Sequence, residues 1–405
     1  MHINQLNEMK LVHTSDWHLG QHFYRFDRDD EHEHFVEQLA EIVKAEQPDA
    51  LIVSGDVYDN AAPSVLAQQR FVQSMIVLHD ACPNCSIVVT AGNHDSGNRL
   101  DVHRPIWEKM RVKVIGTCKR AEDGTFDSNE FIVPISDKGY VVAVPYFHPH
   151  NFPMAAADTE REVRQQRFFE KVMESVTGMN ERNQPIVVMA HLAVEGCDIK
   201  GHEDSAVGGM EKESLTKLGS GYDYLALGHI HMSQSITERV RYSGSPIPLS
   251  FSEAYQHTVS VVEMDAHGDV PKVKELRISP LRNIMTISAE NLDDALRELE
   301  KVEDDVYIRI LIDQEGILPA DAELRAQLVV EGKPCRLCEV RKVMRKREAS
   351  EDTDIQEIDI TDPDCTIRPI DIARRHFRKL NNAEMPEELV QMLEEVITEF
   401  NNVND

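Results

Sequence analysis

The stretch Ala91-Gly-Asn-His-Asp-Ser96 follows the apolar run Ser86-Ile-Val-Val-Thr90, and together they decide the fold expected of this chain. A short run of β-branched residues predicts a buried strand. The chain then turns at a glycine and presents an amide, an imidazole and a carboxylate, which are Asn93, His94 and Asp95. A buried strand with this ending places three polar groups where the sheet opens to solvent.

Polar side chains also follow four other predicted strands. They are Asp16 and His18 after the strand 11–15, Asp56 after 50–54, His191 after 185–190, and His229 and His231 after 224–227. Ligands of open α/β sheets gather beyond the carboxyl ends of the strands, so we expect these side chains to lie together. A lone histidine after a strand is more often a hydrogen-bonded structural residue, but five such endings in order favour a shared site.

Helices predicted between these strands give the chain an α/β fold. Apolar residues at helical spacing predict helices over 29–47, 64–79 and 158–177, and this alternation is typical of a mostly parallel sheet. Further strands over 239–242 and 258–264 indicate a second set of strands. We therefore expect a first domain over residues 9–278.

A different pattern begins after residue 280. Strands over 283–288, 305–312 and 336–344 alternate with helices over 292–302 and 320–330, which predicts a small α+β domain over 282–347. An acidic linker over 348–366 and a helical tail over 367–402 follow. The tail has little core of its own, so its two helices either fold back on this chain or dock on another protein.

The composition is that of a globular protein with a strong negative charge. Of 405 residues, 41% are apolar, and no apolar run approaches the ~20 residues of a membrane span. The N-terminus has no secretory signal pattern. The formal net charge of −28 disfavours nonspecific binding to nucleic acid. A nucleic-acid substrate would require local basic patches, bound cations or a partner.

The seven cysteines, an odd number, argue against a disulfide framework and predict a cytoplasmic protein. Two Cys-x-x-Cys pairs, Cys82–Cys85 and Cys335–Cys338, have the spacing of half a zinc site. Because they lie in different predicted domains, we expect small buried thiols and no shared zinc.

The polar residues at the strand ends predict a hydrolytic metal site. Imidazole and carboxylate ligands without thiolate suit manganese, iron or zinc in such a site. Seven nitrogen and oxygen donors are too many for one open tetrahedral ion. They suit two ions about 3.5–4 Å apart that share a carboxylate and bind a phosphoryl group between them.

These motifs resemble those of the calcineurin-like metallophosphoesterases. They are Ser15-Asp-x-His18, Gly55-Asp56, Gly92-Asn-His-Asp95, His191 and Gly228-His-x-His231. Longer strings, over 13–20, 91–96, 226–231 and 244–251, are similar to those of the SbcD family of bacterial nuclease subunits. The resemblance extends over about residues 9–400 and implies a sandwich of mixed sheets flanked by helices, with a small α+β capping domain and a helical C-terminal tail.

The resemblance also implies roles for individual residues. Asp16, His18, Asp56 and His231 would hold one manganese ion, and Asp56, Asn93, His191 and His229 would hold the other. His94 would stabilise the phosphate at the transition state or protonate the leaving 3′ oxygen; otherwise it is a hydrogen-bonding neighbour of the ligands. Asp95 would orient a neighbouring imidazole.

Members of the SbcD family act with an SbcC-type coiled-coil ATPase on double-stranded and hairpin DNA. The implied activity is a manganese-dependent 3′–5′ exonuclease on duplex ends and an endonuclease on single strands and hairpins, in DNA repair, recombination and replication. The small domain would cap the site, the tail would bind the ATPase, and a homodimer of this chain would fit within a heterotetramer.

One basic cluster is the candidate DNA contact outside the strand-end site, with a solvated strand end as its alternative. Its members are Arg341, Lys342, Arg345, Lys346 and Arg347.

Two other functions remain as alternatives. The first is a metallophosphoesterase for a non-DNA phosphoester, such as a phosphoprotein or a cyclic nucleotide. Protein phosphatases of this superfamily have an arginine soon after Gly-Asp, whereas Gly55-Asp-Val-Tyr-Asp-Asn60 has none. The second is a non-catalytic scaffold that tethers an ATPase to DNA, and the presence of every expected ligand argues against it.

Overall fold

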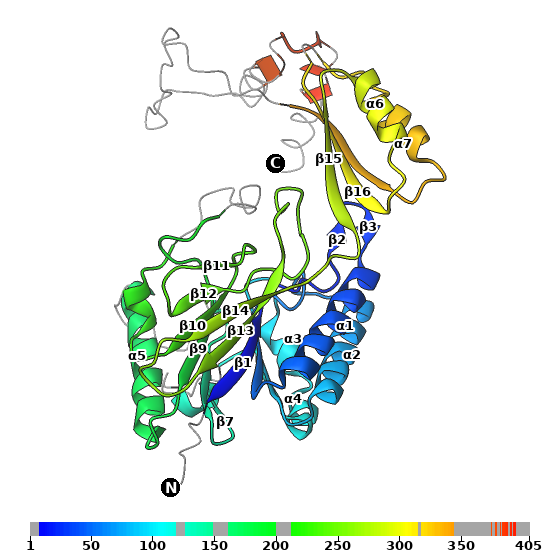
Figure 1. The fold of residues 1–405 in the computed structure, drawn as a ribbon. Helices are drawn as coiled ribbons and strands as arrows, with labels where there is room; N and C mark the ends of the chain where they lie inside the picture. Colours follow the sequence, from blue (N-terminus) through cyan, green and yellow to red (C-terminus); the bar gives the residue numbers. More distant parts are fainter. Residues whose placement is uncertain are drawn as a thin grey trace, which may run out of the picture. The chain divides into compact units, whose positions relative to one another are not determined.

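Two six-stranded sheets form the core of the first of two units into which the chain divides, Met1–Asn283 and Ile284–Asp405. The computed structural model describes residues 8–118, 126–148, 161–199, 212–314 and 317–343, and individual positions between 374 and 393. Each unit is described separately below (Figure 1).

The first sheet has four parallel strands and two antiparallel strands at one edge. Its order is β14 (Lys272–Arg277), β13 (Thr258–Met264), β1 (Met9–Thr14), β4 (Ala50–Ser54), β5 (Ser86–Thr90) and β6 (Val112–Ile115). Strands β1, β4, β5 and β6 run parallel, whereas β13 runs antiparallel to both of its neighbours. The carboxyl ends of β1, β4 and β5 therefore meet at one edge.

The second sheet also combines a parallel centre with antiparallel edges. Its order is β11 (Gln234–Ser235), β12 (Val240–Tyr242), β10 (Tyr224–Gly228), β9 (Ile186–His191), β8 (Gly139–Ala143) and β7 (Ile132–Ile135). Strands β8, β9, β10 and β12 run parallel, and β7 and β11 pair antiparallel at the two edges.

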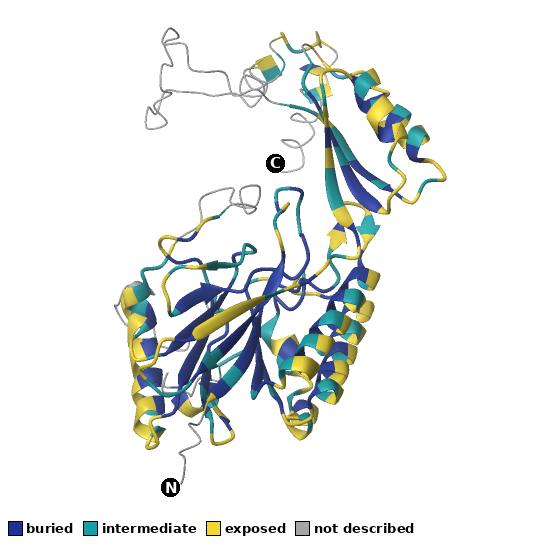
Figure 2. Ribbon diagram, viewed as in Figure 1, coloured by how far each residue is buried: buried dark blue, intermediate teal, exposed yellow. Residues whose placement is uncertain are grey.

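Alternate residues of the central strands face two different apolar layers. Leu11 and Ile52 belong to the core shared by the two sheets, together with Val187 of β9. Val12 and Leu51, one position away on the same strands, pack in the layer formed with the helices of the first sheet. The central strands are therefore buried on both faces, as Figure 2 shows.

Three long helices flank the sheets. They are α1 (Asp29–Glu46) and α2 (Val65–Ala81) beside the first sheet and α5 (Arg161–Met179) beside the second. The first turn of α1 is acidic and its last turn carries Lys44, which complements the helix dipole. Ser64 caps α2 by accepting a hydrogen bond from the amide of Ala67 at 3.1 Å.

Shorter elements complete the first unit. They are the hairpin β2 (His22–Phe23) and β3 (Phe26–Asp27), the helices α3 (Gly97–Asp101) and α4 (Arg104–Trp107), and 3₁₀ turns at Glu108–Met110, Ser128–Phe131 and Leu215–Leu218. Among the helices in the described part of the chain, none has the length and apolarity needed to cross a membrane.

The second unit contains a three-stranded sheet with two helices. In chain order its elements are β15 (Asn283–Ala289), α6 (Leu292–Glu300), β16 (Val306–Ile312), α7 (Ala322–Val330) and β17 (Arg336–Lys342). The strand order is β15-β16-β17, and its separate core includes Ile308, Ala295 and Ala326. Asn291 caps α6 by accepting from the amide of Asp294 at 2.9 Å.

The predicted fold class is confirmed: the chain is an α/β protein with mixed sheets flanked by helices. Strands β6, β7 and β14 were not predicted individually. β14 is largely exposed and carries charged residues along its length, so it lacks the apolar pattern that identifies a strand. The predicted linker over 348–366 lies outside the described residues, as does most of the tail over 367–402, and the predicted domain limits stay predictions.

Candidate metal centre

The loops that follow β1, β4, β5, β9 and β10 bring the predicted strand-end residues together. Four of these residues have φ in the left-handed region: Asp16 (54°), His18 (48°), Asp56 (48°) and His229 (93°). Such backbone is costly for non-glycine residues and persists where the surroundings enforce it. Here the amides of Asp16 and His18 donate to the carbonyls of Gly55 and Asp56 at 3.0 and 3.1 Å, which joins the first two loops.

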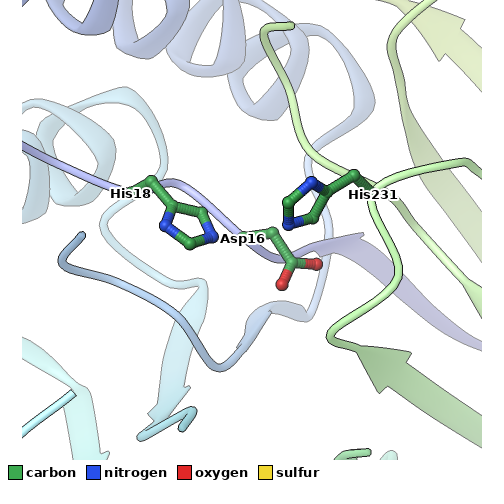
Figure 3. Close-up of side chains that lie close together, drawn as sticks. All are labelled: Asp16, His18 and His231. Carbon is green, nitrogen blue, oxygen red and sulfur yellow. The ribbon is translucent and has the colours of Figure 1, made fainter. Parts of the chain in front are cut away.

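Asp16, His18 and His231 form what we call the first donor group. One ligand atom from each lies within 4.8 Å of the others, and Figure 3 shows the Asp16 carboxylate between the two imidazoles. The Asp16 carboxylate accepts hydrogen bonds from the Ser15 hydroxyl at 2.5 Å and the His229 amide at 2.9 Å. These bonds fix the orientation of the carboxylate.

Asp56, Asn93, His191 and His229 form the second donor group. The Asn93 Oδ1 atom lies 2.9 Å from His191 Nε2 and 2.9 Å from His229 Nδ1. His191 Nε2 also lies 3.2 Å from Asp56 Oδ2. Because His191 Nδ1 donates to the Ser54 carbonyl at 2.9 Å, Nε2 is the ring nitrogen that faces the group.

Asp56 faces both donor groups. Its Oδ2 atom lies 3.6 Å from His18 Nε2 in the first group and 3.2 Å from His191 Nε2 in the second. Its Oδ1 atom accepts from the His94 amide at 2.9 Å. The carboxylate is buried, is held by a backbone amide, and lies between the two donor groups.

The pKa shifts of His191 and Asp56 indicate that the centre favours positive charge. Burial alone would lower the pKa of His191, but the adjacent Asp56 carboxylate raises it to about 9. Burial would likewise raise the pKa of Asp56, but His191 and His18 hold it well below its usual range. Without metal, a proton on His191 therefore neutralises part of the negative charge, and a bound cation would do the same.

Two further observations test whether these residues fit metal ions. His18 Nε2 is buried and has no hydrogen-bond partner among the described residues. This is expected of a nitrogen that binds a metal ion. Burial lowers the pKa of His231 to about 3, so its ring is neutral and can act as a ligand. The donors are imidazole, carboxylate and amide groups without thiolate, and they suit divalent ions in two adjacent places.

Two glycines allow the loops to approach this closely. A Cβ atom added to Gly92 would collide with the Asp56 carboxylate, and one added to Gly228 would collide with the Ser54 carbonyl and crowd His191. Gly92 directly precedes Asn93 and Gly228 directly precedes His229. A larger residue before either donor would therefore collide with the neighbouring loop.

His94 lies beside the donor groups without belonging to either. Its side chain is exposed, and its ring centroid is 4.9 Å from that of His18. Its Nδ1 donates to the Asp59 carbonyl at 2.7 Å, because a carbonyl can only accept. The Nε2 atom is therefore the one that remains for a substrate.

Asp95 differs from the expectation that it orients an imidazole. Its carboxylate accepts from three backbone amides: Gly92 at 2.8 Å, Val57 at 3.0 Å and Tyr58 at 2.8 Å. These bonds join the loop after β5 to the loop after β4. Asp95 thus supports the backbone that carries Asp56 and Asn93.

Sequence reasoning missed two carboxylates of the centre. Glu253 is buried, and its Oε1 atom lies 2.9 Å from His231 Nδ1. Asp59 Oδ1 lies 3.4 Å from His18 Nδ1, and Asp59 groups with His18 and His94 as a potential metal-binding cluster. Asp59 follows Asp56 by three residues in the same loop, which is a usable signal, whereas nothing in the sequence connects Glu253 with His231.

Only part of the predicted basic cluster lies among the described residues. Arg341 and Lys342 lie at the end of β17 in the second unit, with Arg341 Nε 3.8 Å from Glu339. Arg345, Lys346 and Arg347 lie outside the described residues. Cys82, Cys85, Cys335 and Cys338 are buried free cysteines, and in the described part of the chain no thiol joins a potential metal group.

A family model and several known proteins match this chain. The model of the family "Calcineurin-like phosphoesterase" matches residues 9–233, which include all seven predicted ligands. The chain is 32% identical to the SbcD subunit of the SbcCD nuclease of Rhodobacter capsulatus, over 73% of this chain and 76% of that one. It is 30% identical to the protein of the same name from Escherichia coli, over 84% and 86% of the two chains. The corresponding values for Bacillus subtilis are 31%, 70% and 73%.

Proposed function

This chain belongs to the calcineurin-like phosphoesterase family, and on that premise we propose that it is the nuclease subunit of an SbcCD-type complex. Its reaction would be the hydrolysis of DNA phosphodiester bonds. The observation that carries the proposal is the position of Asp56, whose Oδ2 atom lies within 3.6 Å of an imidazole nitrogen of each donor group.

The donor groups would hold two manganese ions. Asp16, His18, Asp56 and His231 would bind one ion, and Asp56, Asn93, His191 and His229 would bind the other. Two bound cations would neutralise the scissile phosphate and supply the Lewis acidity that activates water for in-line attack. The chain's own contribution is to fix these donors through Ser15, Ser54 and Glu253, which hydrogen-bond to Asp16, His191 and His231.

His94 would act on the leaving group. The Asp59 carbonyl accepts from Nδ1–H, so an imidazolium form of His94 would direct its second proton, on Nε2, toward the substrate. A proton donated from Nε2 would neutralise the 3′ oxygen as the P–O bond breaks, or a hydrogen bond from it would stabilise the charge that develops on the phosphate. Its exposure fits a group that must meet a large substrate.

The complex would combine several activities on DNA in the cytoplasm. We propose 3′–5′ exonuclease action on duplex ends and endonuclease action on single strands and hairpins, in repair, recombination and replication. Segment 282–347 would cap the site, the basic cluster would contact DNA, and 367–402 would bind an SbcC-type coiled-coil ATPase, with two copies of this chain in a heterotetramer. The partner would also help a chain of net charge −28 to bind DNA.

The test is cleavage of hairpin and blunt duplex DNA with manganese, with and without the ATPase, beside turnover of bis(p-nitrophenyl) phosphate. Cleavage of DNA that stops with EDTA is the expected result. Turnover of the small diester with intact DNA would indicate a phosphoesterase for another substrate. Failure of both reactions would indicate a non-catalytic scaffold.

A further inference from the structure

A cavity of about 290 Å³ lies beside the second donor group. Three of that group, Asn93, His191 and His229, form part of its lining. Most of the remaining wall is apolar and includes Phe147 and Phe169. We call this space the aromatic cavity; its lining places an apolar surface directly against residues that would hold the metal ion next to the scissile phosphate.

The walls of the aromatic cavity are built into the fold. Tyr146 follows β8, donates its amide to the Ala91 carbonyl at 2.8 Å, and meets the ring of His191 edge-on at a centroid distance of 6.3 Å. Phe168 of α5 is fully buried, and its ring lies 5.3 Å from that of Phe147. Core packing thus holds the aromatic rings in place before any ligand arrives.

Gln165 supplies a polar group inside this wall. Its side chain lines the cavity one helical turn before Phe168 and Phe169, and the residue is only 7% exposed. In the described part of the chain, no hydrogen bond of its amide is recorded, whereas the adjacent Gln166 is exposed and donates to Glu170 at 2.8 Å. The Gln165 amide therefore offers a donor and an acceptor to a ligand that enters the cavity.

We propose that the aromatic cavity receives the base of a nucleotide next to the scissile phosphate, unstacked from the DNA. The proposal rests on the proposed nuclease function. A phosphate bound to the metal ion that Asn93, His191 and His229 would hold would place its own nucleoside at the cavity. Aromatic walls stack on any base, and a glutamine amide pairs with base edges. The volume lies near the lower end of the ~300–1,000 Å³ of small-molecule sites, which suits one nucleoside.

Base capture gives the substrate preference a physical cause. An unpaired nucleotide at a hairpin tip, a single strand or a frayed end can enter the cavity at little cost. A nucleotide inside a duplex must first be unpaired and unstacked, which opposes its capture. Cleavage would therefore occur preferentially where the base beside the scissile bond is free.

Binding of a nucleotide tests the proposal without reference to cleavage. With manganese present, calorimetry should show that 2′-deoxyadenosine 5′-monophosphate binds about tenfold or more tightly than 2-deoxyribose 5-phosphate, which lacks the base. Gln165→Leu should weaken the nucleotide roughly fivefold and leave the sugar phosphate unchanged. Gln166→Leu, the neighbouring exposed position, is the control and should alter neither. Equal affinity of the two ligands for the wild-type chain would overturn the proposal.

Abasic substrates test the same idea on DNA. An abasic residue is placed in turn at each nucleotide that flanks the scissile bond of a hairpin. We expect one position to lower kcat/KM about tenfold, and Gln165→Leu to add no further loss there. If every abasic hairpin is cut at the normal rate, the cavity does not take a base. If neither DNA nor bis(p-nitrophenyl) phosphate is turned over, the nuclease function itself is wrong.

Discussion

Glu253 Oε1 lies 2.9 Å from His231 Nδ1, and this contact directs the opposite ring nitrogen of His231 toward the first donor group. The Glu253 carboxylate is held in turn, because its Oε2 atom accepts from the Leu249 amide at 3.0 Å. A carboxylate on the far nitrogen of a ligating histidine fixes its tautomer and strengthens it as a ligand.

Replacement of Glu253 should therefore weaken a metal site that it never touches. For Glu253→Gln we expect a loss of about 10–100-fold in manganese affinity at the first donor group, with the second group little changed. Calorimetric titration of the metal-free chain measures both affinities. Glu263→Gln, a surface variant that breaks an ion pair with Lys10, is the control. Unaltered manganese affinities in Glu253→Gln would show that Glu253 does not position His231 for metal binding.

His94→Ala should separate metal binding from catalysis. We expect full manganese binding but a loss of about 10²–10⁴-fold in hairpin cleavage, since no proton donor remains for the 3′ oxygen. Turnover of bis(p-nitrophenyl) phosphate should fall much less, because p-nitrophenolate leaves without a proton. His103→Ala, at an exposed histidine of the same unit, serves as the comparison. An equal loss on both substrates would show that His94 acts on the phosphate and not on the leaving group.

Stability should fall in mild acid because of buried neutral histidines. Burial lowers the pKa of His13 and of His32 to about 3. Below the unfolded pKa of about 6.5, these two histidines bind protons in the unfolded chain but stay neutral in the folded chain. The folded state therefore loses stability as the pH falls from 6.5 toward 3. Each histidine should cost ~1.4 kcal/mol per pH unit in that window.

His13→Leu tests this slope. Guanidinium denaturation in EDTA, at pH 7 and at pH 5.5, should show a smaller acid loss for the variant than for the wild-type chain. His22→Leu replaces a histidine of which 59% of the side chain is exposed and should keep the wild-type slope. The same acid loss in wild type and His13→Leu would mean that other groups control the transition.

Removal of the tail should uncouple the chain from its ATPase. Truncation after Asp364 deletes the two predicted helices and leaves every described strand intact. We expect association with the ATPase to be lost and manganese-dependent turnover of the small diester to persist. Co-purification of the truncated chain with the ATPase at the normal ratio would place the interface elsewhere.

The features predicted from sequence are those with a local cause. Strands 50–54 and 86–90 are continuous apolar runs, and β4 and β5 occupy those residues. The parallel order of the strands then explains why polar residues far apart in the chain meet at one edge. The small βαβαβ unit followed equally from helical and strand periodicity.

The features that escaped prediction depend on contacts between distant segments. Glu253 lies 22 residues after His231, in a loop whose path no local pattern reveals. Asp95 was expected to orient an imidazole, but the turn at Gly92 aims its carboxylate at the amides of Val57 and Tyr58. In the sequence, nothing distinguishes Gln165 from the other polar residues of its predicted helix. Only the fold shows that it lines a cavity.

The measurement that tests the central claim most directly is electron paramagnetic resonance of the manganese-loaded chain, with the bound metal quantified. The account predicts two ions per chain with the spectrum of an exchange-coupled pair, and for Asp56→Asn the loss of that coupling together with hairpin cleavage. A wild-type chain that cuts hairpin DNA with one uncoupled ion would contradict the shared role of Asp56.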